Sequence, residues 1–206
     1  MAIEQIKIGF DNFSYVIYCP KNKQAAIVDP GFDATRTLQF IASKKLSLEY
    51  ILITHHHSDH SSDSKRIKSV FPLAKLVASE ADGKKLALKP DIVVSDGSQL
   101  KIGKILLDFL VTPGHTLGGI CIIVDNQALL TGDTLFVGDC GRTDLPGGSL
   151  AQMYASLHEK IMHLPDELIM YPGHDYGEKP FDSLGNQKRT NKTLKAKTLQ
   201  EFSKIP

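Results

Sequence analysis

A cluster of metal-ligating side chains follows directly after a short apolar run, and this junction constrains the fold more than any other feature. Residues 50–53 (Tyr-Ile-Leu-Ile) have no charged member, which predicts a strand covered on both faces. The next segment, Thr54-His55-His56-His57-Ser58-Asp59-His60, places five imidazole or carboxylate side chains within six positions. A buried strand that ends in a polar turn presents such side chains from a rigid base. Imidazole and carboxylate groups suit zinc, iron or manganese, so the segment predicts a metal site at a sheet edge.

Three later segments each combine an apolar strand, a turn that contains glycine and one possible metal ligand. His115 follows the apolar residues 105–111, Asp133 follows 128–130, and His174 follows 168–170. Strand ends that converge on one edge build a pocket in their loops. The candidate ligands are His55, His57, Asp59, His60, His115, Asp133 and His174. Seven ligands exceed the need of one tetrahedral ion and suit two ions that share a carboxylate.

Composition favours one ordinary globular domain over residues 1–206. Hydrophobic residues make up 42% and charged residues 23% of the chain, enough for a buried core. Short strands alternate with helical segments, which predicts an α/β protein of layered sheets covered by helices. No apolar run approaches 18 residues, and the first residues lack the order of a signal peptide. We therefore expect no membrane partner.

Net charge and cysteine content limit which binding partners and which cellular compartment we expect. A net charge of +1 gives no electrostatic reason to expect nucleic acid binding. Three widely spaced cysteines argue against a disulfide framework and favour a reducing, cytoplasmic location. Residues 179–206 hold seven basic and two acidic side chains, which predicts a solvated C-terminal helix and tail. His158 and His163 are expected to face solvent from the helix that follows Ser149.

The ligand motifs together resemble the metallo-β-lactamase superfamily. The resemblance runs over about residues 10–178 and rests on His-x-His-x-Asp-His at 55–60, the lone His115, Gly132-Asp133 and Gly173-His174. It implies an αββα sandwich, with two mixed sheets face to face and helices outside. It also implies that His55, His57 and His115 hold one metal, and that Asp59, His60 and His174 hold the second. Asp133 would then bridge the two ions.

Two further segments are similar to the branch of glyoxalase II (hydroxyacylglutathione hydrolase) and persulfide dioxygenase. These segments are Gly132-Asp133-Thr134-Leu135-Phe136 and Cys140-Gly141-Arg142-Thr143-Asp144. The resemblance implies a hydrolase that cleaves a hydroxyacylglutathione-type thioester with a metal-bound hydroxide. Two divalent ions would act, zinc in the first instance, with iron or manganese as alternatives. Asp59 and Asp133 would be the catalytic carboxylates, and Arg142 and Tyr176 would bind the thiol part of the substrate.

Other functions and roles stay open at this point. A persulfide dioxygenase with a single iron on His55, His115 and Asp133 is the alternative enzyme that the resemblance allows. A structural zinc protein fits less well, because structural zinc sites are closed and rich in cysteine. Asp29 could shape a turn or orient a ligand histidine, and Arg142 could pair with Asp144. We expect a small-molecule thioester or thiol as the partner, and a monomer or homodimer.

Overall fold

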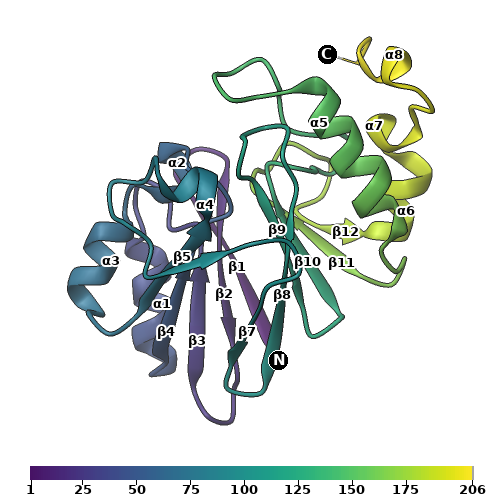
Figure 1. Ribbon diagram of the computed structural model, residues 1–206. Helices are drawn as coiled ribbons and strands as arrows, with labels where there is room; N and C mark the ends of the chain where they lie inside the picture. The colour runs from purple at the N-terminus through teal and green to yellow at the C-terminus, as the bar shows by residue number, and fades with distance from the viewer. Residues whose placement is uncertain (206) are drawn as a thin grey trace.

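The computed structural model describes residues 1–205 and contains two six-stranded sheets packed face to face. The first sheet has the order β1-β2-β3-β4-β5-β6 and the second the order β12-β11-β10-β9-β8-β7. Helices α1 and α3 lie outside the first sheet, and α5 to α8 lie outside the second (Figure 1). This arrangement confirms the predicted αββα sandwich. Within the described residues, no helix combines the length and apolarity needed to cross a bilayer.

The first sheet is mixed, as predicted. Its strands are β1 Ala2–Ile8, β2 Asn12–Tyr18, β3 Gln24–Val28, β4 Ser47–Leu52, β5 Lys75–Ser79 and β6 Ile92–Val94. Strands β1 to β3 pair antiparallel, whereas β3 to β6 pair parallel. Its helices are α1 Thr35–Lys44, α2 Ser58–Ser61, α3 Ser64–Val70 and α4 Glu80–Gly83. The parallel strands direct their carboxyl ends to one edge of the sheet.

The second sheet is mostly antiparallel. Its strands are β7 Gln99–Ile102, β8 Ile105–Val111, β9 Ile120–Val124, β10 Ala128–Gly132, β11 Ile169–Pro172 and β12 Asp182–Ser183. Only β10 and β11 pair parallel, so both end at the same edge. The two-residue strand β12 is absent from the sequence-based prediction, because two residues are too few to carry a periodic pattern.

Three apolar layers hold the sandwich together. The middle layer joins the inner faces of the two sheets, and the outer layers join each sheet to its helices. The end of strand β4 illustrates this arrangement. Leu52 points into the middle layer, while Ile51 and the following Ile53 pack on the side of α1 and α3. All three side chains are almost fully buried, as predicted for a strand covered on both faces. The loop that carries His55 therefore begins at one of the most deeply buried points of the molecule.

The C-terminal segment differs from the predicted solvated tail. Helices α6 Leu184–Thr190, α7 Lys192–Lys195 and α8 Leu199–Phe202 pack on the outer face of the second sheet. Leu184, Leu194 and Phe202 are buried there, beside the helix α5 Leu150–Ala155. The excess of basic residues is real, but it lies on the outer side of short helices whose apolar residues face the core.

The helix that begins after Ser149 is less regular than its sequence pattern predicts. Ser149 caps it as expected, but a π-turn at Ser156–Lys160 and a 3₁₀ turn at Ile161–His163 follow α5. His163 is exposed, as predicted. The solvent prediction for His158 was wrong, because its ring is half-buried and stacks on Tyr154 with ring centroids 4.2 Å apart.

Candidate metal centre

The seven predicted ligands come together where the carboxyl ends of four strands meet. His55, His57, Asp59 and His60 follow β4 in the first sheet. His115 follows β8, Asp133 follows β10 and His174 follows β11, all in the second sheet. The cluster therefore spans the edges of both sheets, and every member lies within eight residues of the end of the preceding strand.

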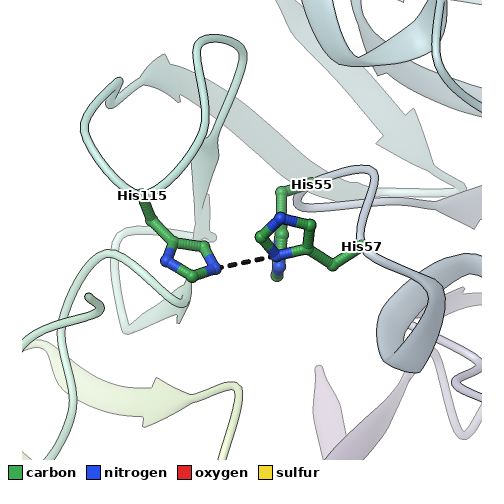
Figure 2. A group of neighbouring side chains, drawn as sticks. All are labelled: His55, His57 and His115. Carbon is green, nitrogen blue, oxygen red and sulfur yellow. Dashed lines mark hydrogen bonds between the residues drawn. The ribbon is translucent and has the colours of Figure 1, made fainter. Parts of the chain in front are cut away.

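One set of three imidazoles faces a common point. Ligand atoms of His55, His57 and His115 all lie within 4.8 Å of one another. Figure 2 shows the three rings directed at one another, with His57 Nδ1 and His115 Nε2 2.9 Å apart. His55 and His115 are buried and His57 is partly buried, so solvent reaches this set from one side. We call these three residues the first set.

A second set of three forms beside it. Ligand atoms of Asp59, His60 and His174 lie within the same limit of 4.8 Å. His174 Nε2 lies 3.2 Å from His60 Nε2 and 3.4 Å from Asp59 Oδ2. We call these three residues the second set.

Asp133 lies between the two sets. One carboxylate oxygen, Oδ1, is 3.4 Å from His60 Nε2 in the second set. The other, Oδ2, is 3.3 Å from His174 Nε2 and 3.5 Å from His115 Nε2 in the first set. A single carboxylate in this place can contribute charge to two cations at once.

Hydrogen bonds on the far side of the rings fix which nitrogens are free. His115 Nδ1 lies 2.7 Å from the carbonyl oxygen of Arg142, which can only accept, so Nδ1 carries the proton. Asp29 accepts in the same way from His60 Nδ1 at 3.0 Å, and Asp11 lies 3.3 Å from His174 Nδ1. This leaves the Nε2 lone pairs of these rings directed at the centre of the cluster. Such outer partners are typical of histidines that bind metals.

Asp29 is thus an acceptor that orients a ligand histidine, one of the two roles left open above. Besides His60 it accepts hydrogen bonds from the main-chain N–H and the hydroxyl of Thr54, at 2.8 and 2.6 Å. It thereby ties the end of β4 to the end of β3. Asp29 adopts a positive φ of 49°, a backbone conformation that Asp tolerates better than most residues.

Two buried polar atoms indicate that the cluster suits a cation. His55 Nε2 and Asp133 Oδ1 have no hydrogen-bond partner among the described residues. A buried polar atom left in this state costs about 1–3 kcal/mol. Divalent cations bound by the two sets would satisfy both atoms, and the donor set of imidazole and carboxylate suits them. The residues present therefore fit a metal centre.

The electrostatics of the two sets differ. Burial, and then the neighbouring imidazole of His115, lower the pKa of His57 to about 4. Burial would also lower the pKa of His174, but hydrogen bonds to Asp133 and Asp59 outweigh it and raise this pKa to about 10. Burial also lowers the pKa of His55, so His55 and His57 are neutral and ready to donate lone pairs at pH 7. A cation that binds the second set replaces a proton on His174.

The predicted substrate-binding residues, Arg142 and Tyr176, line a cavity beside the cluster of candidate ligands. It has a volume of about 320 Å³, and its lining includes His115, Asp133, Arg142 and Tyr176. The ring of Tyr176 stacks on the ring of His174, with the two ring centroids 4.7 Å apart. The exposed guanidinium of Arg142 is held by two 2.7 Å hydrogen bonds to the carboxylate of Asp144. The structure thus shows the Arg142–Asp144 pair and also places Arg142 beside the cluster.

Cys140 lines this cavity too, but it is a poor nucleophile. Burial, and then the charge of Asp139, raise the pKa of the Cys140 thiol to about 12. Main-chain hydrogen bonds from Asn22 and Lys21 lower the pKa of Cys19. With iodoacetamide at pH 8 we expect Cys19 to be alkylated first, because the thiolate is the reactive form. Peptide mass spectrometry over time measures the order, and faster labelling of Cys140 would contradict this account.

Three residues beside the cluster are missing from the sequence-based prediction. Asn12 donates to Asp59 Oδ2 at 3.0 Å, and Asp11 contacts His174 as described. Asp82, which is 1% exposed, accepts from the main-chain N–H of His56 at 3.0 Å. The ring of His56 is directed at Asp82, with Nδ1 3.1 Å from the Asp82 carboxylate. None of the three stands in a ligand motif, and only long-range contacts reveal them.

With this geometry established, the family follows from comparison with known proteins. The family model described as "Metallo-beta-lactamase superfamily" matches residues 8–174. The chain belongs to this superfamily.

Relatives of similar identity carry two different enzyme names. The chain is 32% identical over 195 residues to human mitochondrial persulfide dioxygenase ETHE1, covering 94% of this chain and 75% of that protein. It is 37% identical over 183 residues to hydroxyacylglutathione hydrolase of Polaromonas sp., covering 86% of this chain and 68% of the relative. The crystal structure of ETHE1 from Myxococcus xanthus superposes with a TM-score of 0.90 at 32% identity, over 100% of this chain and 89% of the other. The relatives are enzymes of this superfamily, and their names divide between hydrolase and dioxygenase.

Proposed function

We propose that the protein is a glyoxalase II-like metallohydrolase that cleaves a thioester of glutathione or a similar thiol. One observation carries this proposal: the second set is as complete as the first and has its own supporting contacts. Asn12 and Asp11 position Asp59 and His174, while Asp29 positions His60. A second set of ligands with its own outer partners supports a centre for two cations.

In this proposal the residues divide into two metal sites. His55, His57 and His115 hold one divalent cation, while Asp59, His60 and His174 hold the other. Asp133 contributes charge to both. When bound, such cations would lower the pKa of a coordinated water and polarise the acyl carbonyl, which is the chemistry that thioester hydrolysis needs. Zinc is the first choice, with iron or manganese as alternatives.

The chain supplies orientation and binding. Asp59 is the most exposed side chain of the second set. It orients the attacking water by accepting a hydrogen bond from it. No protein nucleophile takes part, in keeping with the high pKa of Cys140. The thiol leaves as a thiolate, which is stable enough near neutral pH to need no strong general acid. Arg142 offers a fork of donors to a carboxylate of the thiol carrier, and Tyr176 offers a hydroxyl.

The test of this proposal is a thioester assay. We expect protein loaded with zinc, manganese or iron to hydrolyse lactoylglutathione, followed as the fall in thioester absorbance. Absence of turnover with all three metals would contradict the hydrolase. Oxygen uptake by the iron form with glutathione persulfide would then support the alternative below.

The substitution Arg142→Ala tests the role of the cavity. We expect KM to rise about tenfold while kcat changes little, because a contact with a remote part of the substrate is lost equally from ground state and transition state. Lys179→Ala, a change of an exposed basic residue outside the 320 Å³ cavity, is the matched control and should leave both constants unchanged. A fall in kcat alone would place Arg142 in a different role.

The alternative function is a persulfide dioxygenase with one iron. It is favoured by the proximity of His55 and His115 to Asp133, a set of two imidazoles and one carboxylate that suits iron(II) with open positions. The metal content of protein purified without added metal separates the two: one iron per chain favours the dioxygenase, and two ions favour the hydrolase.

A further inference from the structure

Asp82 is a buried carboxylate that lies outside both ligand sets and yet contacts the loops of the first. It sits in α4, after β5, in a segment that contributes no predicted ligand. Its exposure is 1%, and no lysine or arginine within the described residues forms an ion pair with it. Burying a carboxylate without such a partner is costly unless hydrogen bonds compensate. The contacts that compensate it are therefore informative.

Those contacts reach both loops that carry the first set. Asp82 Oδ2 accepts from the main-chain N–H of His56 at 3.0 Å and from the hydroxyl of Thr116 at 2.7 Å. His56 stands between the ligands His55 and His57, and Thr116 directly follows the ligand His115. Through these two hydrogen bonds one oxygen atom joins the chain segments on either side of the first set.

The second oxygen extends the same connection. Asp82 Oδ1 accepts from the main-chain N–H of Gly118 at 2.9 Å. A Cβ on Gly118 would lie 2.8 Å from Asp82 Oδ1 and 2.3 Å from Ser79 Oγ, so this approach requires glycine. The ring of His56 also lies nearby, with Nδ1 3.1 Å from Asp82 Oδ2. The loop after β8 is thus fitted closely against the start of α4.

We infer that Asp82 is a positioning residue that sets the spacing of the first set. This inference rests on the metal-binding part of the proposed function. By fixing His56 and Thr116 relative to each other, Asp82 holds the imidazoles of His57 and His115 at their 2.9 Å approach. It touches no residue of the second set, whose outer partners are Asp11, Asn12 and Asp29. Its loss should therefore weaken one metal site and spare the other.

The experiment measures zinc binding to each set separately. His174→Ala leaves the first set intact, and His57→Ala leaves the second intact. Asp82→Ala is added to each background, and zinc affinity is measured by competition with a chromophoric chelator. We expect a loss of about 10–100-fold in the His174→Ala background, the usual effect of removing an outer partner, and less than about threefold in the His57→Ala background.

Two further variants keep the result interpretable. Asp91→Asn changes another carboxylate of the same sheet, which accepts from Leu76 N–H at 2.8 Å, and should leave both affinities unchanged. Thr116→Val removes a single donor to Asp82 and should weaken the first set alone by a smaller factor, even if Asp82→Ala does not fold. The absorption spectrum of bound cobalt(II) should change in the His174→Ala background only.

Equal weakening of both sets, or no weakening of the first, would overturn the role of Asp82. Failure of the His174→Ala protein to bind zinc while Asp82 is intact would contradict the proposed metal site itself, and the inference with it. Because the readout is metal binding and not turnover, it is independent of the substrate.

Discussion

Asp133→Asn is expected to abolish binding of both metal ions and to lower kcat/KM by about 10³-fold, which corresponds to roughly 4 kcal/mol. The reason is position: the two oxygens of Asp133 lie 3.3–3.5 Å from imidazole nitrogens of both sets. An amide keeps the shape but removes the negative charge that two cations would share. Metal content by emission spectroscopy, together with the thioester assay, checks this result.

Asp139→Asn is the matched control for that substitution. Asp139 lines the same cavity but lies outside both sets and pairs with Lys192 at 2.8 Å. This variant should retain two ions and most of its activity. If Asp133→Asn instead retained two ions with unchanged affinity, Asp133 would not be shared between the sites.

His55→Ala is expected to remove at least one ion and to lower activity by more than about 10²-fold. His55 is 2% exposed, and its Nε2 has no hydrogen-bond partner in the described part of the chain. This nitrogen is therefore free to bind a cation. Removal of one ligand from three exposes the cation to water and weakens its binding. The measurement combines metal content, turnover and the far-UV circular dichroism spectrum, which confirms folding.

His163→Ala serves as the control for His55→Ala, because it removes an exposed imidazole from the helix after Ser149. It should leave metal content and rate unchanged. Full metal content and full rate in the His55→Ala protein would show that the first set is not a metal site.

Much of the fold and of the cluster could be predicted because the signals are local. Apolar runs such as residues 50–53 and 105–111 mark buried strands, and the candidate ligands follow them within a few positions. Each of the four motifs can be recognised without knowledge of the others. The parallel pairing of β10 with β11 could not be predicted in this way, because 36 residues separate Gly132 from Ile169.

What the sequence did not reveal depends on long-range contacts or on irregular packing. Asp82 resembles any polar residue of a short helix, and its partners His56 and Gly118 lie 26 and 36 positions away. The C-terminal helices were judged by their charge, yet each of the three short helices buries one large apolar side chain: Leu184, Leu194 and Phe202. His158 was misplaced because a π-turn changes the direction of its side chain.

The division of the cluster between two sheets has a consequence for the order of events during synthesis. Four of the seven candidate ligands, at positions 55–60, are synthesised more than a hundred residues before His174, which follows β11. All six strands of the first sheet are synthesised before β11. Under the proposed function the complete pair of sites exists only after β11 has joined β10. Bound ions would then connect the two sheets, and metal binding would follow the pairing of β11 with β10.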